Sequence, residues 1–215
     1  PHPAPCPTGK VCPTTVLGAG MKAPDGETIS RAHEPSLLYM PPDPNVPTSL
    51  PNGTLLVVSG VDPSRPPKGV AQGGTLGMRL SHDLGHSWSP IRFPFLPFSN
   101  PKTVGNFFQN QVVWDDEAKT AHIVIGNITD HVGGCDGGEA LNGMLHISSS
   151  DRGLTWTTCT AGSCNMPLPS SPTTCLAPTS GHGVQLTHTG RHQGRLLFVG
   201  VHNTEHYDPL KHDYT

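Results

Sequence analysis

The feature that most constrains the fold is a short motif that occurs twice. Residues 81–88 (SHDLGHSW) and 149–156 (SSDRGLTW) both follow the pattern S-x-D-x-G-x-[ST]-W, each after a strand-like run that begins with Gly-Met. An Asp carboxylate accepts hydrogen bonds from backbone N–H groups of its own turn, and glycine supplies an unusual backbone dihedral. The repeat therefore predicts two equivalent hairpin turns, with structural roles for Ser81, Asp83, Gly85, Trp88, Ser149, Asp151, Gly153 and Trp156.

Short β-type runs separated by turn residues make up most of the chain. We expect strands at 35–40, 54–59, 75–81, 112–114, 122–126, 144–149, 183–187 and 195–201. No stretch of about ten residues keeps a helical apolar period free of Gly and Pro. The 25 glycines and 24 prolines then belong to turns rather than to a disordered chain. An all-β domain is predicted over residues 31–215, after a Pro/Gly/Cys-rich loop segment over residues 1–30.

Charge and hydropathy exclude several classes of protein. The net charge of −3 gives no basic surface for nucleic acid. The longest apolar runs, Leu55–Val58 and Leu196–Val199, are far shorter than the ~18 residues that a membrane helix needs. No Gly-rich phosphate loop is present, and the sequence indicates no cofactor. We assign no metal, because nothing in the sequence brings a cysteine or carboxylate together with His82, His86, His122 or His146.

Cysteines and glycosylation sequons favour an oxidising compartment. None of the six cysteines forms a Cys-x-x-Cys pair, and the close pairs Cys6/Cys12 and Cys159/Cys164 suit local disulfides. Six cysteines allow fifteen connectivities, and the sequence does not choose among them. Sequons at Asn52 and Asn127 also fit a lumenal or secreted protein. The remaining cysteines are Cys135 and Cys175.

Further motifs match one family in the same order along the chain. Pro35–Leu38 followed by Pro51–Leu56 is similar to an opening strand pair written R-I-P-x-L and x-G-T-L-L. Ala177–Leu186 followed by Gly194–Leu197 is similar to P-G-x-G-I-Q-L…G-R-L. On these residues the chain resembles the sialidase (neuraminidase) family over about residues 31–205, and the repeated turn resembles its Asp box, or BNR repeat. The order and spacing most resemble lysosomal-type animal exo-α-sialidases.

The resemblance implies a six-bladed β-propeller in which each blade is a four-stranded antiparallel sheet. The expected strands make about three blades, so the chain corresponds to an N-terminal half of such a propeller. A partial propeller exposes an unclosed edge and apolar side chains that would otherwise lie between blades.

The resemblance also implies a chemistry. Sialidases remove terminal sialic acids with a tyrosine nucleophile paired with a glutamate, while an aspartate serves as acid/base. Three arginines bind the substrate carboxylate, because a guanidinium makes two parallel hydrogen bonds to it. The implied partners are sialylated glycans (glycoproteins, gangliosides or oligosaccharides), and the implied location is lumenal or lysosomal.

Few of the family's functional residues match this chain directly. The first carboxylate-binding arginine corresponds to His33, and Arg31, two residues earlier, replaces it only if the strand bulges. Asp62 is the acid/base candidate, although its surroundings also suit a turn-former. His182 and Gly183 are candidates to line the pocket, with a plain tight turn as the alternative.

Two functions from different classes follow. The first is exo-α-sialidase activity, with two arginines and the tyrosine–glutamate pair supplied by later blades. The second is a catalytically inactive sialidase-like propeller that binds glycans or has a structural role. Under either reading, the chain by itself is expected to be inactive as a hydrolase.

Overall fold

Alternating burial along the first strand shows why this sequence forms a sheet. In the computed structural model, β1 (Ile29–Met40) buries Ser36, Leu38 and Met40, whereas Leu37 and Tyr39 are exposed. A period of two places the buried side chains on one face of the strand. The structure describes residues 15–23, 26, 28–43, 52–63, 75–94, 110–128, 141–157, 166, 175–188, 190–203, 207–208 and 213–214.

The first sheet is an antiparallel meander. It contains β1, β2 (Thr54–Pro63) and β3 (Thr75–Ser81) in the order β1-β2-β3. A single antiparallel bridge between Met78 and Arg92 adds a fourth segment beside β3. All three strands include ranges predicted from the sequence, and β1 begins at Ile29, within the segment expected to be a loop.

The second sheet repeats this meander and then departs from it. β4 (Asn110–Asp115), β5 (Thr120–Ile128) and β6 (Leu141–Ser149) are antiparallel. On the other side of β4, the two-residue strand β8 (Gly181–His182) is parallel to it, giving the order β6-β5-β4-β8. The prediction of antiparallel sheets did not include this pairing, which joins residues about 70 positions apart.

The remaining strands are short and form two-stranded pairs. β7 (Cys175–Pro178) pairs with β11 (Gly200–Asn203), and β9 (Val184–Gln185) pairs with β10 (Leu196–Leu197). β12 (Tyr207–Asp208) pairs with β13 (Asp213–Tyr214). The strand expected at 183–187 is therefore shortened to β9, and the one expected at 195–201 is divided between β10 and β11. β7, β8, β12 and β13 had no counterpart in the sequence-based prediction.

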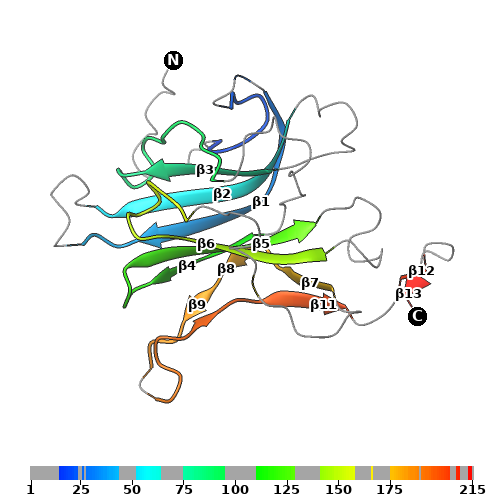
Figure 1. The fold of residues 1–215 in the computed structure, drawn as a ribbon. Helices are drawn as coiled ribbons and strands as arrows, with labels where there is room; N and C mark the ends of the chain where they lie inside the picture. Colours follow the sequence, from blue (N-terminus) through cyan, green and yellow to red (C-terminus); the bar gives the residue numbers. More distant parts are fainter. Residues whose placement is uncertain are drawn as a thin grey trace, which may run out of the picture.

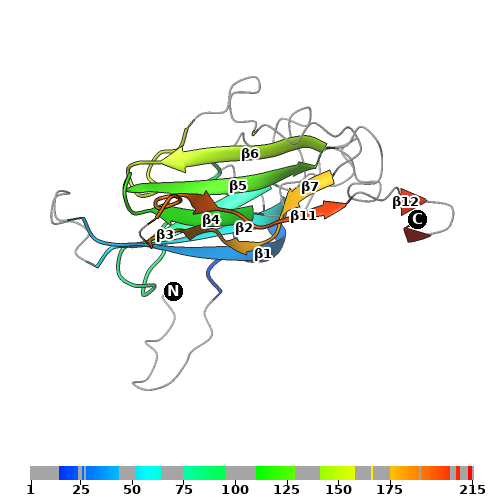
Figure 2. The same cartoon turned by 90° about the horizontal axis from the view of Figure 1, so that it is seen from below.

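The main core lies between the two meanders. Figure 1 shows the β1–β3 sheet above the β4–β6 sheet, with β9 and β11 below both, and Figure 2 shows the same strands from another side. Burying aliphatic side chains from both sheets is the largest favourable contribution to packing these layers. The cluster consists of Leu38, Met40, Leu56, Val58, Leu76, Met78, Leu80, Val112, Ala121, Ile123, Ile125, Leu145 and Ile147, with Trp114 and Trp156 at its margin.

A smaller core covers part of the outer face of the first sheet. Ala23, Ile29, Val61 and Ile91 are buried there, and Leu17, Met21, Ala32 and Phe93 pack against them. The segment before β1 thus contributes to the domain core. It is also tied to the first sheet by the Arg79 guanidinium, whose Nη1 donates to the Val16 carbonyl at 2.6 Å.

The outermost faces of this stack carry exposed apolar side chains. On the first sheet these are Leu37 (45% exposed) and Tyr39 (47%), and on the β9–β10 hairpin and beyond they are Val184, Leu197 and Val199. No sheet closes on itself in the described part of the chain. The all-β fold and the partial propeller expected from the sequence are both observed, and the exposed end faces are those of an unclosed arc.

The turn after β3, Ser81–Trp88, is held by side-chain hydrogen bonds. The Asp83 carboxylate accepts bonds from the Ser87 hydroxyl (2.6 Å) and the Ser87 N–H (2.8 Å), and the Ser81 hydroxyl donates to it at 2.8 Å. The Ser87 bonds hold the pKa of Asp83 at about 2. Leu84 and Gly85 both have positive φ, which is why glycine is needed in this turn.

The turn after β6, Ser149–Trp156, has the same geometry. Asp151 accepts bonds from the Thr155 N–H (2.8 Å) and hydroxyl (2.5 Å), and from Ser149 at 2.8 Å. Arg152 and Gly153 take the left-handed conformations. Burial acts to raise the pKa of Asp151, and the hydrogen bonds from Thr155 outweigh it, so the pKa is lowered. The two motifs occupy equivalent corners of two successive sheets, as the repeat predicts.

Part of the cysteine and sequon predictions lies outside the described residues. This is true of Cys6, Cys12, Cys135, Cys159 and Cys164, and nothing is described of the Cys175 or Asn127 side chains. Asn52 is exposed at the start of β2. Within the described ranges there is no helix with the length and apolar character to cross a membrane.

We predict that Asp151→Ala lowers the free energy of unfolding by about 2–3 kcal/mol, because three hydrogen bonds to a charged acceptor are lost. Asp116→Ala is the control, since Asp116 is 63% exposed and its ion pair with Lys119 contributes little. Urea unfolding of both variants measures the difference. Equal losses for the two variants would contradict a structural role for this turn.

Candidate functional site

Three strands that are distant in the sequence meet around Ser36 of β1. The Ser36 hydroxyl donates to the Asn110 carbonyl at 3.0 Å, and the Gly181 N–H donates to Ser36 Oγ at 3.1 Å. Asn110 Nδ2 also donates to the Glu34 carbonyl at 3.0 Å. β1, β4 and β8 are therefore joined by buried polar groups rather than by a continuous backbone ladder. This junction brings the sequence-predicted residues of β1 and β8 into one region.

Gln111 forms a second link between sheets. Its side chain accepts from the Val199 N–H at 2.9 Å and donates to Thr179 Oγ1 at 2.6 Å and to the Val199 carbonyl. Gln111 is buried, so this complete set of partners avoids the cost of an unsatisfied amide. These bonds fix the segments next to β7 and β11, which contain Thr179 and Val199, to β4.

β1 bulges on both sides of the segment that holds the candidate residues. One extra residue of β1 lies between Ile29 and Arg31, and another between His33 and Ser36, relative to β2. Each bulge shifts the alternation of side chains between the two faces of the strand. β1 is therefore bulged next to His33, and the replacement of the expected arginine by Arg31 stays a prediction.

Arg31 and Asp62 are paired with each other. They face one another across β1 and β2, and Arg31 Nε and Nη2 lie 2.8 Å and 2.7 Å from the same oxygen, Asp62 Oδ2. The arginine side chain is 58% exposed, whereas that of the aspartate is 11% exposed. Arg31 is accessible to a ligand, whereas Asp62 is a partly desolvated carboxylate with a cation bound to it. Their catalytic and binding roles stay predictions.

Two other predicted site residues, His33 and His182, lie on β1 or contact it. His33 pairs with Gly60 in the β1–β2 ladder. The exposed His182 contacts the Leu37 carbonyl through its ring Nε2, so it joins β8 to β1. A side chain at Gly183 would clash with the Leu197 carbonyl and contact Val113, so this glycine allows close packing of strands. Pocket-lining roles for His182 and Gly183 also stay predictions.

His122 and His146 form a contact that the sequence did not indicate. They lie on neighbouring strands, their ring nitrogens are 2.9 Å apart, and their rings stack at 16° with centroids 5.1 Å apart. Burial lowers the pKa of both histidines. For His122 the charge of His146 lowers the pKa further, while the charge of Asp115 acts to raise it. No three His, Cys, Asp or Glu side chains are placed to hold a metal in the described part of the chain. The sequence could have revealed this pair only if the register between β5 and β6 had been known.

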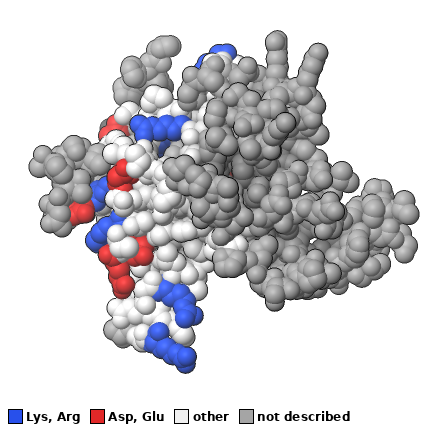
Figure 3. Space-filling model, in the orientation of Figure 1, with Lys and Arg blue, Asp and Glu red and all other residues white. Residues whose placement is uncertain are grey.

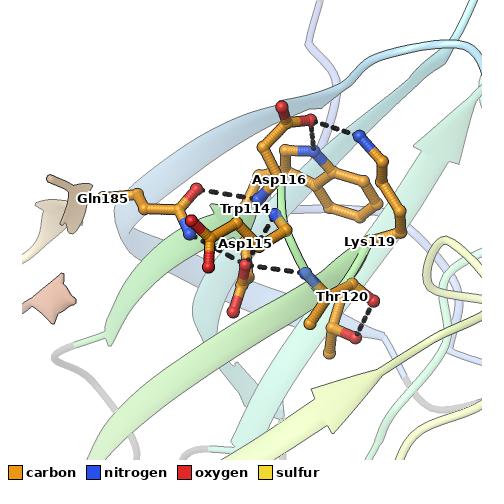
Figure 4. Close-up of polar contacts among 8 residues, drawn as sticks. Trp114, Asp115, Asp116, Lys119, Thr120 and Gln185 are labelled. Carbon is orange, nitrogen blue, oxygen red and sulfur yellow. Dashed lines mark hydrogen bonds and ion pairs between the residues drawn. The ribbon is translucent and has the colours of Figure 1, made fainter. Parts of the chain in front are cut away.

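The β4–β5 turn carries the densest polar cluster, shown in Figure 4. Asp115 accepts from the N–H groups of Glu117 and Ala118 at 2.9 Å and from Gln185 Nε2 at 2.8 Å. Gln185 Oε1 in turn accepts from the Asp116 N–H at 2.8 Å. Every one of these contacts closes the turn or fixes β9 to it, so the cluster is structural rather than catalytic.

The charges of the described residues on the face in Figure 3 do not form a patch of one sign. On the face in Figure 3, basic and acidic side chains are mixed over the described residues. The β9–β10 hairpin differs, since residues 184–197 include Arg191 and Arg195 and no acidic residue. Both arginines are exposed.

Comparison with known proteins supports the fold. The sequence matches no family model and no curated protein. Among solved structures, the chain is similar to a leech intramolecular trans-sialidase in complex with 2,7-anhydro-Neu5Ac (TM-score 0.56, 12% identity, 90% of this chain). It is also similar to the Ruminococcus gnavus intramolecular trans-sialidase in complex with oseltamivir carboxylate (0.54, 12%, 94%). A third is the Hadza microbial sialidase Hz136 (0.51, 17%, 72%).

These likenesses cover only part of the known structures. The chain spans 43% of the leech protein, 62% of the Ruminococcus gnavus protein and 30% of the Hadza protein. At 12–17% identity the similarity is one of fold. The chain therefore has a sialidase-like fold, and it corresponds to a portion of the propeller.

We predict that the His122–His146 contact makes stability fall on acidification. Because folding lowers both pKa values, the unfolded chain binds protons more readily, and stability is lost as the pH falls below the unfolded value of about 6.5. His146→Gln reduces this loss, whereas His192→Gln, at an exposed position, leaves it unchanged. Urea unfolding at pH 7.5 and 5.5 measures the effect; identical pH dependence in all three proteins would refute it.

Proposed function

We propose that this chain is part of an exo-α-sialidase that removes terminal sialic acids from glycoconjugates. The observation that carries the proposal is the sialidase-like fold with an accessible arginine, Arg31, on the bulged first strand. A guanidinium at this place suits the carboxylate of a sialic acid. The two equivalent turns, which we take as Asp boxes of the BNR type, support the same family.

In the proposed enzyme this chain supplies one carboxylate-binding arginine and the acid/base candidate, and later blades supply the other catalytic groups. The resemblance assigns two further arginines and the tyrosine–glutamate pair to later blades. Asp62 is the candidate acid/base here, and its present pairing with Arg31 keeps its charge neutralised in the absence of ligand. A sialic acid carboxylate binding to Arg31 competes with Asp62 for the same cation and thereby releases it.

A glycan-binding propeller without catalysis is the second candidate. The Arg31–Asp62 ion pair favours it, because the carboxylate that is the acid/base candidate is already bound by the arginine. Binding of a sialoside requires Arg31 but no acid/base group. Hydrolysis of a sialoside distinguishes the sialidase from the glycan-binding propeller, whereas both are expected to bind the sialoside.

The proposed setting is a lumenal, lysosomal or secreted one, with sialylated glycoproteins, gangliosides or oligosaccharides as partners. The lysosomal-type animal enzymes are the proposed nearest kind of relative. The six cysteines and the exposed sequon residue Asn52 support an oxidising, glycosylating compartment.

We predict that Arg31→Gln weakens binding of 3′-sialyllactose at least about tenfold, because a charged two-point contact is lost. Arg195→Gln, on the β9–β10 hairpin, is the matched control and leaves binding unchanged. NMR titration of the chain measures both. Equal affinities for wild type and Arg31→Gln would remove Arg31 from the site.

Hydrolysis is tested separately with a fluorogenic sialoside over roughly pH 4 to 7. The present chain and any longer form of the protein are both assayed. Activity in a longer form supports the sialidase proposal, whereas binding with no activity in any form supports the glycan-binding alternative.

A further inference from the structure

Glu34 has a left-handed backbone conformation in a β-bulge, where glycine is the usual residue. Its φ of +54° lies in the left-handed region, which is unfavourable for any residue other than glycine. It lies in the bulge of β1 between His33 and Ser36. The other described non-glycine residues with positive φ are Leu84, Lys119 and Arg152, and all three lie in tight turns whose closure requires it. Strain of this kind within a strand is characteristic of functional sites.

Contacts from two other strands hold Glu34 in place. The Asn110 amide donates to its carbonyl at 3.0 Å, and the Ser180 hydroxyl donates to its carboxylate Oε2 at 2.8 Å. Ser180 directly precedes β8 and is exposed, and Glu34 is only partly buried. The carboxylate thus sits at the junction of β1, β4 and β8, with one of its oxygens oriented by a neighbouring sheet.

The Glu34 carboxylate retains capacity to accept hydrogen bonds. An ionised carboxylate accepts about four, and among the described residues only Ser180 donates to it. Asp62 differs, because two nitrogens of the Arg31 guanidinium bind one of its oxygens, and the Asp62 side chain is only 11% exposed. Glu34 and Arg31 are three residues apart on β1, which is at most about 10 Å along the strand. That spacing fits a single sugar residue with its substituents.

We propose that Glu34 is a ligand-binding residue that accepts hydrogen bonds from hydroxyl groups of a bound glycan, with Ser180 as its positioning residue. The proposal rests on the proposed function, because it takes a glycan as the ligand of Arg31. In an acidic sugar the carboxylate lies toward Arg31 and the hydroxyl groups toward Glu34, since the reverse places two negative charges together.

The experiment is an NMR titration of the chain with 3′-sialyllactose and, separately, with lactose. Glu34→Gln weakens binding of 3′-sialyllactose about tenfold, and Glu117→Gln, an exposed acid in the β4–β5 turn, leaves it unchanged. Ser180→Ala weakens binding by a smaller factor, and Ser180→Thr restores it because the hydroxyl is retained.

Glu34→Gly separates a binding role from a structural one. Glycine adopts positive φ without strain, so this variant loses glycan binding while its Tm stays the same or rises by about 2–4 °C. If Glu34 serves only to hold the three strands together, Glu34→Gly and Ser180→Ala lower the Tm and leave the affinity of the remaining folded protein unchanged. That result overturns the proposal.

The titrations also separate this proposal from the proposed function. Binding of 3′-sialyllactose that is unaffected by Glu34→Gln refutes the role of Glu34 and leaves the sialic acid proposal standing. Binding of lactose alone, lost in Glu34→Gln, supports Glu34 and refutes sialic acid recognition. Binding of neither glycan by the wild-type chain refutes both.

Discussion

A carboxylate that closes its own turn is the interaction on which the rest of the structure depends. Asp83 and Asp151 each bind the N–H and hydroxyl of the residue four positions later, and so fix where the chain leaves β3 and β6. Gly153 in the second turn lies against Leu80 of the first sheet, where an added Cβ would lie only 3.0 Å from a Leu80 methyl group. The turn geometry therefore sets the packing of one sheet on the next, which in turn aligns the strands that carry the site.

The site depends on polar groups where the strands are too short to form a ladder. β8 has only two residues, and Ser36, Asn110 and Gln111 supply the bonds that a longer strand would make through its backbone. Buried polar groups with complete partners specify one arrangement of sheets more sharply than apolar contact does, because any slip leaves a group unsatisfied. The bulges of β1 are thus held in one register while Arg31 remains accessible.

The parts of this fold that follow local rules were predictable from the sequence. Alternation of apolar residues located β1 to β6, and the S-x-D-x-G pattern located both turns to the residue. The parallel pairing of β8 with β4, the His122–His146 contact and the left-handed Glu34 were not predictable. Each of these depends on which distant segments become neighbours, and neither strand propensity nor turn chemistry carries that information.

The placement of charge at the candidate site has a consequence for how a ligand binds there. Arg31 is paired with Asp62 before any ligand arrives, so a carboxylate ligand gains less from Arg31 than it would from an unpaired arginine. In the proposed function, other groups of the ligand add affinity, and hydroxyl recognition by the pre-positioned Glu34 carboxylate needs no further ordering of the protein. Under this proposal, an arginine shared with an aspartate favours glycans that carry both a carboxylate and hydroxyl groups over simple anions, because the two interactions contribute together.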